Sequence, residues 1–188
     1  IVIDSSTRDH SVPFNYSGYK LTGHEISYRL SDLYHLKVRN LDASDDQLVL
    51  DSLEIISPYD KLEFQNHVPY EKAWLKLLVP KIELSGSDID YLSDTFVLSA
   101  TKVNLHKADL NIYKDNRQPP NPFFKPLYSR MIRELPVKLS IDSISIVDSD
   151  INFQVRTKDE PPPGIVYFQR VNGTISNLNN MGMGQSDF

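Results

Sequence analysis

The 188-residue sequence contains no cysteine. Disulfide bonds, thiolate metal sites and cysteine nucleophiles are therefore excluded together, while the redox compartment stays open. Long hydrophobic runs are also missing, because apolar runs such as Leu77-Leu78-Val79 fall far short of the roughly 18 residues that a membrane span needs. The sequence as given thus predicts neither a membrane-spanning helix nor a signal-type segment.

A positive charge excess is lacking as well. The net charge is −5, the isoelectric point is near 5.5, and no block of lysine and arginine stands out. Nucleic-acid binding requires such a basic surface, so nucleic acid is not an expected partner. At roughly 150 residues per domain, the length predicts a single domain spanning residues 1–188. The polar tail that follows Leu178 suggests a fragment excised from a longer chain.

Recognisable catalytic and metal-binding motifs are absent too. The five histidines are scattered, and no His-x-Glu, P-loop, nucleophile-elbow or dinucleotide-binding string occurs. Asp88-x-Asp90 and Asp148-x-Asp150 pair carboxylates but do not continue into the ligand series of an EF-hand loop, so turn formation explains them better. We therefore expect no catalytic residue, no metal site and no cofactor, and hence a protein that is not an enzyme.

What the sequence does contain is a recurring spacing, apolar-x-apolar-x-x-apolar-x-apolar. On a helix, offsets of 0, 2, 5 and 7 would scatter the four side chains around the circumference. In a strand, each half alternates with period two, and one extra residue in the middle must be absorbed by a bulge to keep all four on one face. The units are Leu36/Val38/Leu41/Ala43, Leu48/Leu50/Leu53/Ile55, Leu77/Val79/Ile82/Leu84, Leu98/Ala100/Val103/Leu105 and Leu139/Ile141/Ile144/Ile146, with Val166/Phe168/Val171/Gly173 as an imperfect sixth.

Two local patterns accompany these units. The residues at the change of parity are twice Asp-Ser, at 51–52 and at 142–143, and such short polar side chains favour irregular backbone. Three units are followed by a small residue, Asp, an apolar residue, any residue and an apolar residue, beginning at Ser87, Ala108 and Ser149. We interpret this second pattern as a turn that leads into the next antiparallel strand.

One insertion interrupts the β pattern. Prolines prevent regular structure up to position 126, after which Leu127, Met131 and Leu135 fall on one helical face before Pro136. This predicts one short helix of about two turns between roughly 126 and 135. We expect it to pack on the sheet as a cover for apolar surface, and the alternative is a mobile lid that gates a site.

Four segments carry a family resemblance, namely Leu48-Val-Leu-Asp-Ser-Leu-Glu-Ile-Ile-Ser-Pro-Tyr59, 74–86, 135–146 and 165–178. They resemble the large AsmA-like (AsmA/TamB-type) envelope proteins of Bacteroides-type bacteria, and the similarity runs from about residue 36 to 180. The resemblance implies a mainly β fold, an elongated, twisted antiparallel sheet of repeated short strands curled into a groove. It also implies a periplasmic or envelope location, an anchor in the inner membrane, and a role in lipid transport and outer-membrane biogenesis.

The predicted function is therefore non-enzymatic handling of a phospholipid or another acyl-chain lipid along an apolar groove. A sheet with one continuous apolar face must cover that face with protein or with lipid, since a large bare patch is a liability. The candidate groove residues are Leu53, Ile55, Ile82, Leu84, Val103, Leu105, Ile144 and Ile146.

Two alternatives belong to other functional classes. The first is a structural or protein-interaction β domain whose apolar face is an ordinary sealed core. The second is a carbohydrate-binding or carbohydrate-active domain, for which aromatic residues supply stacking surfaces. These are Tyr16, Tyr19, Tyr28, Tyr34 and Trp74.

Overall fold

The computed structural model describes residues 18–92, 95–122, 137–158 and 162–181. Strands make up 72% of this part, and they form one nine-stranded sheet, so the predicted mainly β class is confirmed. The helical structure within these ranges is one 3₁₀ turn, η2 (Phe64–His67). The strands are β1 (Lys20–Ser31), β2 (Tyr34–Ser44), β3 (Gln47–Ile56), β4 (Trp74–Ser85), β5 (Asp88–Leu92), β6 (Thr95–His106), β7 (Asp109–Asp115), β8 (Val137–Arg156) and β9 (Gly164–Asn179).

The nine strands occupy seven positions across the sheet, and we call each position a lane. Two lanes each hold two strands, one after the other along the chain direction. β5 continues the lane of β4, because β6 pairs with β4 through Lys102–His106 and with β5 through Thr95–Ser99 in one unbroken register. β7 continues the lane of β6 in the same way, since both pair with β8 in a single parallel register. The lanes therefore follow the order β1, β2, β3, β4 with β5, β6 with β7, β8 and β9.

The sheet is mixed, which corrects the expectation of an antiparallel sheet. β8 runs parallel to β6 and to β7, while the other pairings are antiparallel. A parallel neighbour requires a crossover connection of about a dozen residues or more. The chain between Asp115 and Val137 is long enough to return to the starting end of the sheet, so β8 begins beside β6 instead of forming a hairpin with β7.

The predicted irregularity at the change of parity is present in β3. Ser52 has a φ of +53°, a left-handed conformation that adds twist and shifts the side-chain alternation by one residue. Glu25, Lys107 and Asp148 have the same conformation, with φ between +50° and +53°. The strand registers align these residues into one line across the sheet, the first bend line, which comprises Glu25, Arg39, Ser52, Pro80, Lys107 and Asp148.

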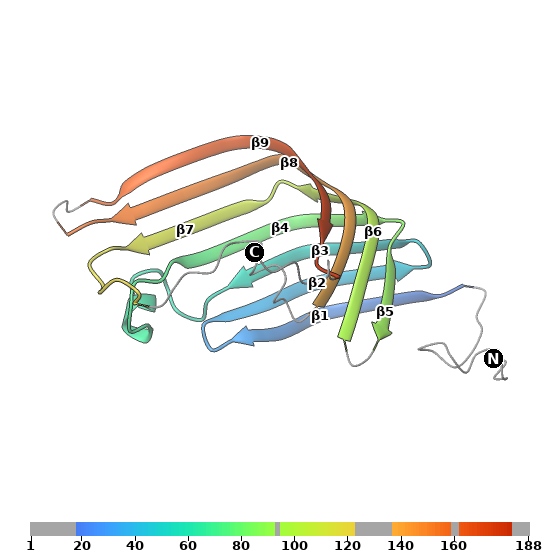
Figure 1. Cartoon of the computed structure of the whole chain (residues 1–188), viewed down its shortest axis with the longest axis horizontal. Helices are drawn as coiled ribbons and strands as arrows, with labels where there is room; N and C mark the ends of the chain where they lie inside the picture. The colour runs from blue at the N-terminus through green and yellow to red at the C-terminus, as the bar shows by residue number, and fades with distance from the viewer. Residues whose placement is uncertain (1–17, 93–94, 123–136, 159–161, 182–188) are drawn as a thin grey trace, which may run out of the picture.

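A second bend line crosses the longer lanes six residues away. It comprises Gly86, Thr101, Asp142 and Asn177, of which Gly86 has a φ of +58° and Asn177 a φ of +57°. Asp142 and Ser143 are not in the left-handed conformation, and the left-handed residues of this line lie instead on β9, at Asn177, and between β4 and β5, at Gly86. In Figure 1, β8 and β9 run along the top of the sheet and bend downward at one end, where β8 lies beside β6.

The small-Asp pattern marks bends and not turns, which corrects the second sequence interpretation. Gly86, Lys107 and Asp148 each precede one copy, and the chain continues in the same lane afterwards. Ser149 lies inside β8, where its hydroxyl accepts a hydrogen bond from the backbone N–H of Ala108 over 3.1 Å. A buried small side chain at the inside of a bend leaves room for the backbone to change direction.

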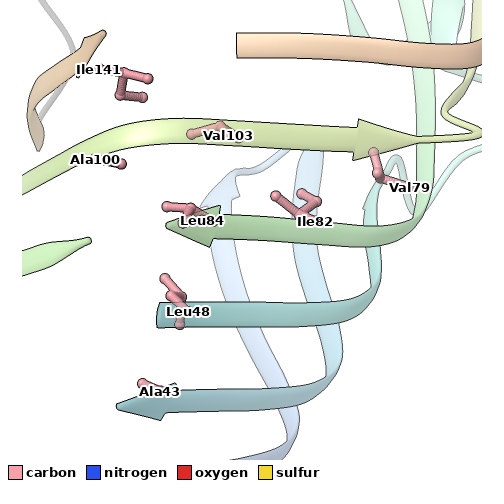
Figure 2. Close-up of a cluster of buried hydrophobic side chains, with 8 residues drawn as sticks. All are labelled: Ala43, Leu48, Val79, Ile82, Leu84, Ala100, Val103 and Ile141. Atoms are coloured by element: carbon pink, nitrogen blue, oxygen red, sulfur yellow. The ribbon is translucent and has the colours of Figure 1, made fainter. Parts of the chain in front are cut away.

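The predicted helix between 126 and 135 lies outside the described residues. The core lies where the sheet folds toward itself, and Figure 2 shows its buried members on five strands, β2, β3, β4, β6 and β8. We call the face that carries this cluster the inner face and the opposite face the outer face. The cluster consists of Ala43, Leu48, Val79, Ile82, Leu84, Ala100, Val103 and Ile141.

Candidate functional site

The strand registers connect the apolar units into continuous rows on the inner face. One row runs from Leu36 through Ile55, Leu77 and Leu110 to Ile151, each residue paired with the next. Paired residues of neighbouring strands project from the same face of a sheet. Each row is therefore an apolar stripe that crosses the sheet perpendicular to the strands.

A second row shows how the rows enter the core. Leu84 pairs with Val103, and Val103 pairs with Ile144. Leu84 and Val103 are buried in the cluster, and Ile144 packs against them. The repeated spacing thus places equivalent residues of successive strands side by side.

The eight candidate groove residues lie on the inner face in three groups. Ile82, Leu84 and Val103 are buried members of the cluster. Leu53, Leu105 and Ile144 are partly buried and pack against it. Ile55 and Ile146 lie outside the cluster, although their register partners Leu77 and Leu105 belong to its rim.

Burial divides these candidates by what they can contact. Val103 is only 7% exposed, because side chains from other strands of the same chain cover it. A side chain that is already buried offers little surface to an acyl chain. The exposed parts of the inner face are therefore better placed for a ligand than the buried candidates.

Exposed apolar side chains of the inner face lie on the two outermost lanes and, at Ile89, on β5. On β9, Val166 is 49% exposed and Phe168 is 53% exposed, and they pair with Phe153 and Ile151. On β1, Leu21 is 58% exposed and pairs with Ala43. The apolar face therefore continues beyond the core to both lateral edges.

The unit on β1 was missed in the sequence. Leu21, Gly23, Ile26 and Tyr28 have the same offsets of 0, 2, 5 and 7, and they pair with the four members of the unit on β2. The signal was present in the spacing but obscured, because Gly23 and Tyr28 do not count as aliphatic. The imperfect unit on β9 likewise extends to Ile175 and Leu178 on the same face.

Residues 57–73 and 116–122 meet at the end of the sheet remote from the second bend line. The Tyr34 hydroxyl accepts a hydrogen bond from the Leu75 N–H and donates one to the Ala73 carbonyl, both over 3.1 Å. Burial raises the pKa of this hydroxyl above its usual value. Phe64, which is fully buried, packs against the Tyr34 ring.

Asp115 forms a buried charged contact at this end. Its side chain is 2% exposed and accepts hydrogen bonds from the Arg117 guanidinium, with Nη2 2.6 Å from Oδ2. The hydrogen bonds from Arg117 hold the pKa of the Asp115 carboxyl below its usual value. A buried carboxylate is thus compensated where the chain leaves β7.

A polar cavity of about 220 Å³ lies nearby. The Lys61 Nζ donates a hydrogen bond to Gln154 Oε1 over 2.9 Å and lies 5.6 Å from the centroid of the Tyr113 ring. Lys76, Asn111 and Trp74 are among the other lining residues, and none of the described residues that line the cavity carries a carboxylate. Its chemistry suits an anionic or hydroxyl-bearing group, as the amides and ammonium groups can donate hydrogen bonds.

The described side chains include no cluster of three or more His, Cys, Asp or Glu residues able to hold a metal ion. None of the helical structure in the described ranges is long and apolar enough to cross a membrane. No protein-family model matches the chain, and neither a curated protein nor a solved structure is significantly similar to it.

Proposed function

We propose that this chain is a non-enzymatic lipid-handling module that binds acyl chains along its inner face, within a membrane-anchored protein of the periplasm or cell envelope. The observation that carries the proposal is the extension of the apolar rows past the buried cluster to exposed residues on both outer lanes. These residues include Leu21 and Tyr28 on β1, and Val166 and Phe168 on β9. The resemblance of the repeats to AsmA-like proteins supports the same function.

The chemistry of the inner face favours acyl chains over small polar ligands. Neighbouring strands lie about 4.8 Å apart, so a row of aliphatic side chains offers a continuous apolar strip. Burying a methylene group of a ligand there is worth about 0.8 kcal/mol. The rows contain few polar groups that could select a headgroup, so we expect binding with little headgroup selectivity.

Adjacent residues on β9 provide a matched test of this proposal. Val166 and Ile165 are each 49% exposed, but Val166 pairs with Phe153 on the inner face and Ile165 pairs with Gln154 on the outer face. The Val166→Asp and Ile165→Asp variants thus place the same charge on opposite faces of one lane. Val103→Asp is a poorer probe, because a charge in the buried cluster would unfold the protein.

The experiment is mass spectrometry of lipid co-purified from a bacterial membrane-containing lysate. We expect phospholipid with the unmodified protein and with Ile165→Asp, and about tenfold less with Val166→Asp, because an unpaired charge among acyl chains is costly. Circular dichroism and thermal unfolding establish that both variants are folded. Equal lipid in the two variants, or none with the unmodified protein, would contradict the proposal.

The sealed cluster at the bends favours a second candidate, a structural or protein-interaction domain. Eight buried side chains fill the space where the sheet folds toward itself, with no ligand needed to cover them. Absence of lipid from a folded protein would support this candidate. A carbohydrate-binding role has weaker support, from Trp74 at the edge of the polar cavity.

A further inference from the structure

The two lateral edges of the sheet differ in charge. Within the described residues, β1 pairs only with β2, and β9 pairs only with β8, so each presents one unpaired edge. β9 is 16 residues long, and Arg170 is its only charged residue. Proteins usually protect long, exposed edge strands with charges, prolines or short length, since their free N–H and C=O groups bind other strands.

The inner-face residues of the two edges match in register on either side of the bend. If β9 of one copy is placed antiparallel to β1 of a second copy, Phe168 lies opposite Tyr28 and Ile175 lies opposite Leu21. Gly173 then lies opposite Gly23, so the two positions of the apolar units that lack a side chain face each other. Each pair continues a row of the sheet, because Phe168 and Tyr28 already pair with Ile151 and Leu36.

The strand directions and the bend are compatible with this arrangement. β1 and β8 run in the same direction, and β9 runs opposite to both, so β1 of the second copy is antiparallel to β9. Arg170 and Glu25 are the left-handed residues of the two edges, with φ of +53° and +51°. In this register Arg170 lies opposite Ile26 and Glu25 opposite Val171, so the two charged residues are one position apart along the joint. Their opposite charges are complementary.

A twofold pairing of like edges is less favourable. In such a pair the two identical strands run in opposite directions, so the apolar rows of one copy meet those of the other in reversed order. Aligning the bends of two β9 edges would bring Arg170 against Arg170, and two β1 edges would bring Glu25 against Glu25. Like charges directly opposite one another destabilise a strand pair.

We propose that copies of this chain associate head to tail, with β9 of one copy pairing antiparallel with β1 of the next. The apolar inner face then continues across the joint. Because the two surfaces are different, the contact is heterologous and leaves a free edge at each end, so it builds an open series. This association does not depend on lipid binding.

Disulfide trapping tests the register, since the chain has no cysteine of its own. Thr22 and Thr174 are exposed outer-face residues that the proposed register sets directly opposite each other. Opposite residues of an antiparallel pair have Cα atoms about 4.5–5.5 Å apart, within the range of a disulfide. A mixture of Thr22→Cys and Thr174→Cys should therefore form the mixed dimer, and the double variant should form a ladder of covalent oligomers.

A control shifts one partner along the strand. Ser176→Cys mixed with Thr22→Cys forms a diagonal pair with Cα atoms roughly 7–8 Å apart, and it should cross-link about tenfold more slowly. Like-with-like dimers forming as fast as the Thr22–Thr174 mixed dimer would overturn the proposal. So would cross-linking at equal rates by the diagonal pair.

Charge exchange provides an independent test without cysteines. Arg170→Glu should weaken self-association by roughly threefold in sedimentation velocity, because exposed ion pairs contribute only modestly to stability. The Glu25→Arg/Arg170→Glu double variant restores complementary charges and should restore association. A protein that stays monomeric at every concentration, or a double variant weaker than Arg170→Glu, would overturn the proposal.

Discussion

Asn180 and Leu139 are joined by two hydrogen bonds. The backbone N–H of Leu139 donates to Asn180 Oδ1 over 2.6 Å, and the backbone N–H of Asn180 donates to the Leu139 carbonyl over 3.1 Å. The Asn180 Nδ2 also donates to the Val137 carbonyl over 2.9 Å. One buried amide therefore ties the end of β9 to the beginning of β8.

Replacing this amide should loosen both strand ends. Asn180→Ala leaves the Leu139 N–H and the Val137 carbonyl without their side-chain partner, and we expect a loss of about 1–3 kcal/mol in unfolding free energy. Urea denaturation measures the loss, and hydrogen exchange should show faster exchange at the Leu139 amide. The matched control is Asn179→Ala, on an exposed residue one position earlier. Equal destabilisation by the two variants would contradict this role.

The buried cluster should dominate stability. Leu84 is 5% exposed, and Leu84→Ala should lower the unfolding free energy by about 2–5 kcal/mol through lost burial and a cavity. The matched control is Leu21, which lies on the edge strand β1 and is 58% exposed. Leu21→Ala should lower the unfolding free energy by less than about 1 kcal/mol. A similar loss of unfolding free energy in the two variants would contradict the assignment of Leu84 to the core.

The second bend line depends on glycine at one position. Gly86 has a φ of +58°, and a Cβ there would lie 2.5 Å from Thr101 Oγ1, so Gly86→Ala should destabilise the protein by more than about 1 kcal/mol. At Gly173 no atom lies within 4 Å of an added Cβ, and Gly173→Ala should be neutral or stabilising by about 0.4–1 kcal/mol. Thermal unfolding of the pair checks the prediction, and the reverse order would refute it.

Asp115 should make stability depend on acidic pH. Its pKa in the folded protein is lowered by Arg117, so it binds a proton less readily when folded than when unfolded, where the pKa is about 3.9. The stabilisation is complete above the unfolded pKa and is lost as the pH falls below about 4 toward the folded pKa. Asp115→Asn should lower the unfolding free energy at pH 7 and flatten this acid limb in urea titrations. A limb of unchanged steepness in Asp115→Asn would exclude this origin.

The sequence predicted the inner face because the spacing encodes it directly. Offsets of 0, 2, 5 and 7 keep four side chains on one face only if the strand absorbs one residue, and Ser52 does so with its left-handed backbone. Six of the eight candidate groove residues accordingly meet in or against one cluster. Their contact with lipid stays a prediction.

The order of the strands in the sheet could not be predicted from the apolar spacing. A spacing describes which face a residue occupies but not which strand lies beside it. The parallel placement of β8 therefore had no local signal, since it depends on the long connection after Asp115. The small-Asp pattern was misread for a related reason, because Ala108-Asp109 suits a turn and a bend equally well by composition.

The first bend line also has an evolutionary consequence. Six lanes contribute a residue to it at the same level, so every hairpin brings its own share of the curvature and of the apolar rows. Duplication of one hairpin would lengthen the sheet by two lanes, or about 10 Å, without requiring compensating changes elsewhere in the core. A chain built in this way can vary in length by gain or loss of whole hairpins, with natural selection acting on each addition separately.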